Sequence, residues 1–139
     1  MIVQDVMTRD PYVALVRDSL RTVLSKLAEA DIRHLPVTED GSLVGIVSDR
    51  DLREVVPSAL SALERPLEAA RILARPVSEL MSTDVISVNP GDDLVEAIDL
   101  MIEHRVGAVP VVDAGSAELV GIVSYVDALR AAREFLAEE

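Results

Sequence analysis

The chain has 139 residues, half of them apolar, which is enough for one compact domain or for two small halves that fold together. Its 13 Lys and Arg against 25 Asp and Glu give a net charge of -12, which disfavours binding to DNA or RNA. The chain has no cysteine and no apolar run long enough to span a membrane, so we expect a cytoplasmic globular protein without disulfides, thiolate metal sites or membrane contact.

The first predicted elements are a short segment, VQDVMTRD at residues 3–10, and an amphipathic helix with Asp18 as its N-cap. Apolar residues at 20, 23, 24 and 27 supply the buried face of this helix. A short apolar run follows at 35–38, then a turn rich in Asp and Gly, then the β-branched run LVGIVS at 43–48. A second helix begins at DRDLREVV. The order is therefore strand, helix, strand, strand, helix.

The second half of the chain repeats this pattern. Residues 3–41 align with 77–115 at an offset of about 74, and 44–51 align with 120–127 at an offset of about 76. Asp92 is the expected N-cap of the second amphipathic helix. Because one copy cannot cover both faces of three short strands, we expect the copies to pack sheet against sheet with helices outside. The predicted organisation is repeat 1 at 1–56, a connector at 57–76 and repeat 2 at 77–139.

The connector, Pro57–Pro76, is rich in alanine, and Pro66 limits any helix in it to short pieces on either side. Two interpretations remain open. The connector is either a solvated spacer or a partly helical segment that binds a partner.

The sequence Gly-Ile-Val-Ser-x-x-Asp occurs twice, at 45–51 and 121–127. Ser48 and Asp51 fall where a strand meets a helix N-terminus, which favours anions. A carboxylate can accept both hydroxyls of a ribose, and a serine hydroxyl can donate to a phosphate. For one copy taken alone, an ordinary N-cap that binds no ligand is the favoured explanation, whereas two copies favour a nucleotide site.

Several short motifs occur in both copies: MTRD and MSTD, HLPV and AVPV, GIVSDRDL and GIVSYVDAL. With these motifs the chain resembles a tandem pair of cystathionine-β-synthase (CBS) domains, the Bateman module, and it looks most like the CBS portion of bacterial acetoin-utilisation regulatory proteins. The resemblance covers nearly the whole chain. It implies an α/β (α+β) fold of two β-α-β-β-α repeats, packed through their sheets with pseudo-twofold symmetry.

The resemblance also implies which residues hold a nucleotide: the aspartate takes ribose, the serine takes phosphate, and apolar side chains such as Ile32 and Val106 enclose adenine. The candidate residues for repeat 1 are Thr8, Arg9, Asp10, Tyr12, Ile32, Arg33, His34, Pro36, Ser48 and Asp51, to which the charge difference between the copies, described next, adds Arg50. Those implied for repeat 2, as a weaker site, are Ser82, Thr83, Asp84, Ile86, Val106, Gly107, Ala108, Pro110, Ser124 and Asp127.

The two copies differ in charge. Residues 3–53 carry seven basic and nine acidic side chains, a net charge of -2, whereas residues 77–129 carry one and ten, a net charge of -9. Arg33, His34 and Arg50 are replaced by Gly107, Ala108 and Val126 in the second copy. We therefore expect phosphates to prefer the first site, and the second to stay empty or to take a less charged ligand.

The chain has no P-loop, no dinucleotide fingerprint and no pair of histidines in a metal-binding pattern, so we predict neither catalytic residues nor a metal site. The predicted function is that of a regulatory CBS pair that senses energy or metabolites by binding AMP, ADP or ATP. S-adenosylmethionine and NAD are the alternative ligands, and Mg²⁺ is expected only with a polyphosphate. The expected partners are a second copy, in a homodimeric disc of four repeats, and an unknown regulated protein. The alternative is a structural or interaction protein with vestigial ligand clefts.

Overall fold

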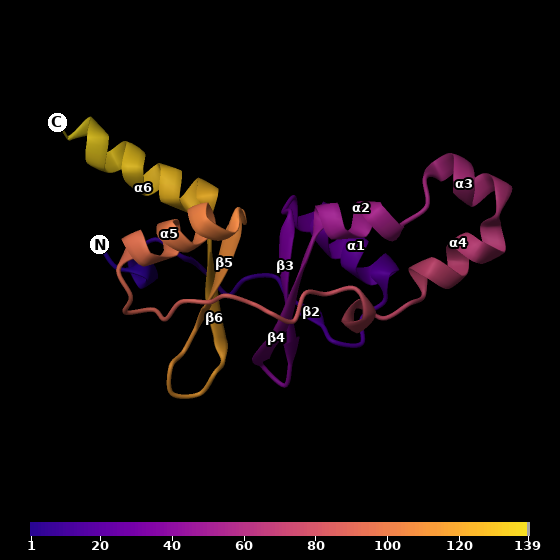
Figure 1. Ribbon diagram of the computed structural model, residues 1–139, viewed down its shortest axis with the longest axis horizontal. Coiled ribbons are helices and arrows are strands. Elements are labelled where there is room, and N and C mark those ends of the chain that lie inside the picture. The colour runs from indigo at the N-terminus through magenta and orange to yellow at the C-terminus, as the bar shows by residue number, and fades with distance from the viewer. Residues whose placement is uncertain (139) are drawn as a thin grey trace. The chain divides into compact units, whose positions relative to one another are not determined.

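The computed structural model describes residues 1–138 and has mixed α and β structure with two three-stranded sheets (Figure 1). This confirms the predicted fold class. In the described part of the chain, no helix is both long and apolar enough to cross a membrane. The elements in chain order are a 3-10 helix (Val3–Asp5), β1 (Thr8–Arg9), β2 (Ala14–Leu15), α1 (Leu20–Ala30), β3 (His34–Glu39), β4 (Ser42–Ser48), α2 (Asp49–Val55), α3 (Ala59–Glu64), α4 (Pro66–Leu73), a second 3-10 helix (Val77–Glu79), α5 (Leu94–His104), β5 (Ala108–Val112), β6 (Leu119–Ser124) and α6 (Tyr125–Ala137).

The chain divides into two compact units that do not coincide with the sequence repeats. Unit 1 comprises residues 1–11, residues 41–43 and the chain from Ile86 onward. Unit 2 comprises residues 12–40 and 44–85. Each repeat therefore contributes its first segment to the unit that contains the helices of the other repeat.

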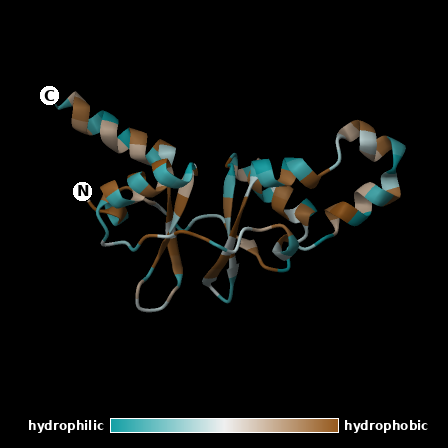
Figure 2. Cartoon of the chain, in the orientation of Figure 1, coloured by the Kyte–Doolittle hydropathy of each residue, from teal (hydrophilic) through white to brown (hydrophobic). Residues whose placement is uncertain are grey.

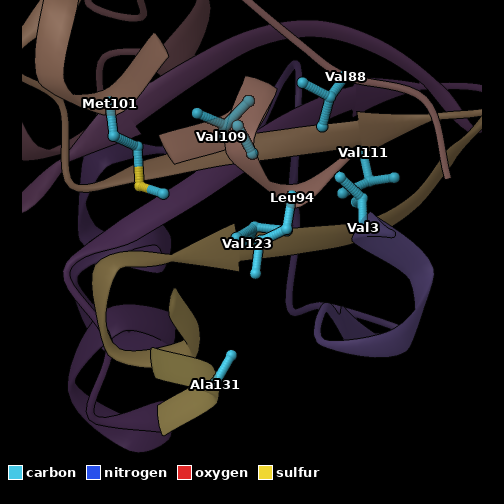
Figure 3. Close-up of a cluster of buried hydrophobic side chains, with 9 residues drawn as sticks. Val3, Val88, Leu94, Met101, Val109, Val111, Val123 and Ala131 are labelled. Carbon is cyan, nitrogen blue, oxygen red and sulfur yellow. The ribbon is translucent and has the colours of Figure 1, made fainter. Parts of the chain in front are cut away.

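The sheet of unit 1 has the order β1-β6-β5, and both pairings are antiparallel. In β1, Thr8 lies opposite Ile122 of β6. At the other edge, Val88 forms a parallel bridge to Val111 of β5. Figure 3 shows the core of this unit, in which valines from β5 and β6 face Leu94 and Met101 of α5, with Val3 from the first segment beside them.

The sheet of unit 2 has the order β2-β3-β4, and β2 pairs parallel with β3 through Ala14 and Val37. The outer edge of β4 is paired by Ser82, whose backbone exchanges two hydrogen bonds of 2.9 and 3.0 Å with Ile46. The fully buried residues of this unit include Leu20 of α1, Leu35, Val47 and Leu52, together with Val77 from the start of repeat 2.

Two glycines allow these edge segments to approach the sheets closely. A Cβ atom at Gly121 would lie 2.6 Å from Met7 Sδ and 2.9 Å from the backbone oxygen of Thr8. A Cβ atom at Gly45 would lie 2.5 Å from Met81 Sδ and 3.0 Å from the backbone oxygen of Ser82. The glycine of each Gly-Ile-Val-Ser motif is therefore required by the chain that crosses it.

The helix caps correct one prediction. Asp18 and Asp92 are not N-caps, because the capping side chains belong to the next residues, Ser19 and Asp93, which accept from backbone N–H groups at 3.1 Å. Asp18 instead accepts from Leu15 N at 2.9 Å, and its salt bridge to Lys26 Nζ is 2.7 Å long. Burial raises the pKa of Asp18, but the hydrogen bonds from Lys26 and Leu15 and the charge of Lys26 outweigh it, so its pKa is lowered.

Two short helices in unit 2 flank Pro66, which occupies the first turn of α4, where a missing N–H costs little. They form a helical hairpin, drawn in magenta to pink beyond α1 and α2 in Figure 1. Its groove of about 350 Å³ is lined by Pro57, Ser61, Glu64, Arg65, Glu68, Ala69 and Ile72.

Candidate functional site

The first Ser-x-x-Asp sequence closes the N-terminus of α2 with a reciprocal capping box. Ser48 Oγ accepts from the backbone N–H of Asp51 at 3.1 Å, and Asp51 Oδ2 accepts from the backbone N–H of Ser48 at 3.0 Å. Within residues 1–138, neither Asp51 Oδ1 nor the hydroxyl hydrogen of Ser48 has a hydrogen-bond partner. The cap therefore leaves one acceptor and one donor available at this helix end.

The segment before β3 lies against this cap. The backbone N–H of Asp49 donates to the carbonyl of Arg33 at 2.9 Å, which fixes Arg33 and His34 beside the start of α2. Burial is the main cause of a lowered His34 pKa; the charge of Asp51 opposes this effect, Arg33 adds to it and Asp49 opposes it. A half-buried imidazole, a guanidinium and a capping carboxylate thus gather at one end of unit 2.

The second Ser-x-x-Asp sequence makes the same box at α6, but its polar groups are more fully engaged. Asp127 Oδ2 accepts from the backbone N–H of Ser124 at 2.9 Å and from the Ser124 hydroxyl at 3.1 Å. The hydroxyl of Thr8 lies 3.4 Å from both Asp127 carboxylate oxygens. A ribose hydroxyl would therefore compete with two side chains of the protein for this carboxylate.

The charges around the second box also differ from those around the first. Tyr125 N donates to the carbonyl of Gly107 at 2.9 Å, which reproduces the Asp49 to Arg33 bond of unit 2. Gly107 and Val126 stand where unit 2 has Arg33 and Arg50. Unit 1 carries four basic and thirteen acidic residues, whereas unit 2 carries nine and twelve. The net charge is therefore -3 for unit 2 and -9 for unit 1, so an anionic ligand is repelled less by unit 2 than by unit 1.

The first segments of the two repeats are exchanged relative to the sequence-based grouping. We predicted Thr8, Arg9 and Asp10 beside Ser48 and Asp51, but they belong to unit 1, where β1 pairs with β6 next to Ser124. We predicted Ser82, Thr83 and Asp84 beside Ser124 and Asp127, but they belong to unit 2, where Ser82 pairs with Ile46. The repeat alignment does not encode this pairing, because short edge strands pair by tertiary contact.

The other candidate residues lie in the unit that contains their own Ser-x-x-Asp sequence. Tyr12, Ile32, Pro36 and Arg50 are in unit 2. Ile86, Val106, Ala108 and Pro110 are in unit 1. Met7 and Met81, which lie over the two glycines, begin the repeated MTRD and MSTD motifs but were not among the candidate residues.

The family model for the CBS domain matches residues 3–58 and 77–134, which include both capping boxes and both edge segments. The chain belongs to the CBS domain family. The tandem match agrees with the predicted resemblance to a CBS pair.

Among curated relatives, the CBS domain-containing protein YhcV of Bacillus subtilis is 34% identical over 125 residues, which cover 90% of this chain and 81% of YhcV. The chain is 30% identical to MJ1225 of Methanocaldococcus jannaschii over 93% of its own length but only 46% of that protein. In the homoserine O-acetyltransferase of Methanocorpusculum labreanum, the match covers only 20% of the enzyme. CBS proteins thus match along most of this chain, and in that enzyme the CBS region is a small part.

Solved CBS-pair structures resemble the whole fold. CBSX2 in complex with AMP has a TM-score of 0.80 and 30% identity, covering 96% of this chain and 97% of that one. The acetoin utilisation protein AcuB from Vibrio cholerae has a TM-score of 0.78 and 36% identity, covering 99% and 93%. The CBS pair of MJ0100, solved with 5-methylthioadenosine and S-adenosyl-L-methionine, has a TM-score of 0.76 and 26% identity, covering 94% and 98%.

Proposed function

We propose that this CBS pair is a non-catalytic regulatory module that binds AMP, ADP or ATP at the α2 capping box. The observation that carries the proposal is the box formed by Ser48 and Asp51, with Arg33 and His34 held beside it. Binding would change the conformation or rigidity of the pair, and a partner or dimer mate would sense that change.

The chemistry of the box suits a ribose phosphate. Asp51 Oδ1 is available to accept ribose hydroxyls, and the Ser48 hydroxyl can donate to a phosphate oxygen. Arg33 and Arg50 supply positive charge for the phosphates, and Ile32 supplies an apolar surface for adenine. Mg²⁺ enters this proposal only with ADP or ATP, whose adjacent phosphates can chelate it.

The Ser124 and Asp127 box is proposed to bind more weakly, and to prefer ligands of lower charge. Its carboxylate already faces the hydroxyls of Ser124 and Thr8, and it lacks the counterparts of Arg33 and Arg50. The complexes of CBSX2 with AMP and of MJ0100 with two adenosyl compounds support an adenosyl ligand class. S-adenosylmethionine and NAD, the alternative ligands, are included in the thermal unfolding test below.

Calorimetric titration of AMP, ADP and ATP into matched variants tests the proposal. Asp51→Ala removes the ribose acceptor and should weaken nucleotide binding by at least about tenfold. Asp127→Ala, which removes the equivalent cap, is the control for helix destabilisation and should leave the tighter site intact. Equal loss in the two variants would contradict the asymmetry, and tight binding that survives Asp51→Ala would contradict the site.

A second candidate function, a structural or interaction role without a ligand, is favoured because the capping box at α2 is already complete in the protein alone. Ser48 and Asp51 satisfy each other's backbone groups without a ligand, so the pair can serve as a helix cap in a structural or interaction protein with vestigial clefts. Thermal unfolding distinguishes the two functions. A ligand at 100 times its dissociation constant adds about 2.7 kcal/mol of stability. No shift with AMP, ATP, NAD or S-adenosylmethionine would favour the structural function.

The proposal includes a homodimer of two CBS pairs, a disc of four repeats, with repeat 1 at 1–56, the connector at 57–76 and repeat 2 at 77–139. In a twofold dimer the same surface patch of each subunit contacts the other subunit. A conformational change caused by the ligand in one CBS pair would therefore reach the second pair through this interface. The proposed compartment is the cytoplasm, where adenine nucleotide levels follow energy state. Sedimentation with and without AMP tests the dimer.

A further inference from the structure

Large apolar side chains are left exposed on four of the helices. Of the fourteen exposed large hydrophobic residues in the described chain, ten lie on α3, α4, α5 and α6, and none lies on α1 or α2. Figure 2 shows hydrophobic residues along α6 and along the α3–α4 hairpin. The uncovered apolar surface is thus concentrated on one helix pair in each unit.

The α3–α4 hairpin is poorly anchored within its own unit. Helix α3 has six residues and buries none of them, and Ala69 is the one buried residue of α4. Leu60, Leu63 and Leu67 are 66%, 81% and 77% exposed. Because helices this short are marginal in water, a second surface that covered these leucines would stabilise the hairpin.

The α5–α6 pair is anchored in the core of unit 1 by Leu94, Ala97 and Met101 of α5, but it also leaves large apolar side chains exposed. Every described residue after Ala131 is exposed, including Phe135 and Leu136 in the last turns of α6. Leu129 and Leu136 are seven residues apart on α6, as are Val95 and Ile102 on α5, so each helix carries an exposed apolar stripe. This is a typical surface for packing another helix.

The charges on the two surfaces are complementary. Helix α5 carries Glu96, Asp99 and Glu103 and no Lys or Arg, and none of these acids has an ion-pair partner within residues 1–138. Residues 57–76, which include the hairpin, have three Arg and two acids, and Arg71 is exposed and unpaired within the same range. Helix α6 adds Arg130 and Arg133 against Asp127 and Glu134, so the two helices together have a net charge of -3, whereas residues 57–76 have a net charge of +1. Two α5–α6 surfaces facing each other would instead bring like net charges together.

We propose that the α3–α4 hairpin of one copy packs on the α5–α6 surface of a second copy. The proposal rests on the homodimer proposed above and specifies its orientation. A twofold axis makes the contact twice, so unit 2 of each chain faces unit 1 of its partner, in a head-to-tail dimer. Arg71 faces the acids of α5, and the exposed leucines of the hairpin cover the apolar stripes of α5 and α6.

Cysteine cross-linking tests this orientation cleanly because the chain contains no cysteine. Leu63→Cys and ¹⁵N-labelled Leu136→Cys proteins are mixed, allowed to exchange subunits and oxidised, and the disulfide dimers are identified by mass. We expect the mixed 63–136 disulfide to exceed both homodisulfides. Ser116→Cys, on the exposed turn before β6, reports random collision. Leu67→Cys with Phe135→Cys serves as a second pair if either protein fails to fold.

Charge reversal gives an independent measurement. Arg71→Glu and Asp99→Arg should each weaken dimerisation by about tenfold, since the contact occurs twice, and the double variant should regain most of that loss. Sedimentation equilibrium measures the dissociation constants. A wild-type protein that stays monomeric would overturn the proposed homodimer and this contact together. A stable dimer with predominant 136–136 disulfides, or no recovery in the double variant, would overturn the head-to-tail contact alone.

Discussion

The hydroxyl of Thr8 lies 3.4 Å from both carboxylate oxygens of Asp127, 119 positions further along the chain. In the other unit, Ser82 pairs through its backbone with Ile46, two residues before Ser48. Each Ser-x-x-Asp box is therefore accompanied by the first segment of the opposite repeat. It follows that a change at the start of one repeat acts on the candidate site of the other.

Truncating the two equivalent valines tests this exchange without a ligand. Val3 and Val77 are fully buried in units 1 and 2, respectively. Val3→Ala should cost about 1–2 kcal/mol and speed local amide exchange about 5- to 30-fold. The faster exchange should appear in β6 and at Ser124, and Val77→Ala should affect β4 and Ser48 instead. Hydrogen exchange read by NMR or mass spectrometry gives the result. Faster exchange within the same repeat as the substitution would show that the repeats, not the units, fold together.

Close packing over the glycines gives a second prediction. Gly121→Ala places a Cβ atom 2.9 Å from the Thr8 backbone oxygen, which cannot move without disturbing the β1–β6 pairing. We expect a loss of about 1–3 kcal/mol in urea unfolding, the usual cost of overpacking. Gly91→Ala is the matched control, because a Cβ atom there meets nothing within 4 Å. Similar stabilities of the two variants would contradict this prediction, because β1 would then move away from the new Cβ atom at little cost in free energy.

The repeated motifs make the fold and both capping boxes predictable from sequence. The offset between copies aligns Ser48 with Ser124 and Asp51 with Asp127, and the serine and aspartate spacing is itself the capping-box pattern. The helix faces were equally clear, since Leu20, Val23 and Leu27 recur at helical spacing and are buried.

Two features could not be predicted from the sequence: the pairing of each repeat's first segment with a strand of the other repeat, and the exact residue at which each amphipathic helix starts. Strand β1 has only two residues, both exposed, so it carries no periodic signal that identifies its partner. Asp18 and Ser19 are adjacent and both are good capping residues, so local preference cannot choose between them. The choice is made by Leu15 and Lys26, which engage Asp18 and leave Ser19 to cap α1.

Substitutions at Ser48 separate its role as a cap from its proposed role as a phosphate donor. Ser48→Asp keeps a good N-cap, so its stability should stay within about 0.5 kcal/mol of wild type, whereas Ser48→Ala should lose about 1 kcal/mol. Ser48→Asp also removes the hydroxyl donor and adds a negative charge, so AMP binding should be lost while adenosine binding is largely kept. Urea unfolding and calorimetry measure the two effects. Undiminished AMP binding by Ser48→Asp would show that Ser48 serves only as the N-cap of α2 and does not donate to a phosphate.

The protonation of His34 gives a pH-dependent prediction. Burial is the main reason that its pKa lies below the usual value, so the folded protein binds fewer protons than the unfolded chain as the pH falls. Stability should therefore decrease on acidification through the unfolded pKa of about 6.5, and it should level off below the lowered folded pKa. His34→Gln should flatten this part of the profile. Urea unfolding across the range checks the sign; a wild-type protein that gains stability on acidification there would contradict the buried neutral imidazole.

The same histidine reports where a phosphate binds. A phosphate dianion beside His34 favours the imidazolium, so AMP should raise the His34 pKa, whereas adenosine should leave it nearly unchanged. The other histidine, His104, lies exposed in the last turn of α5 in unit 1 and serves as an internal control in the same NMR titration. An equal response of the two histidines to AMP would indicate non-specific binding. A response confined to His104 would move the phosphate site to unit 1.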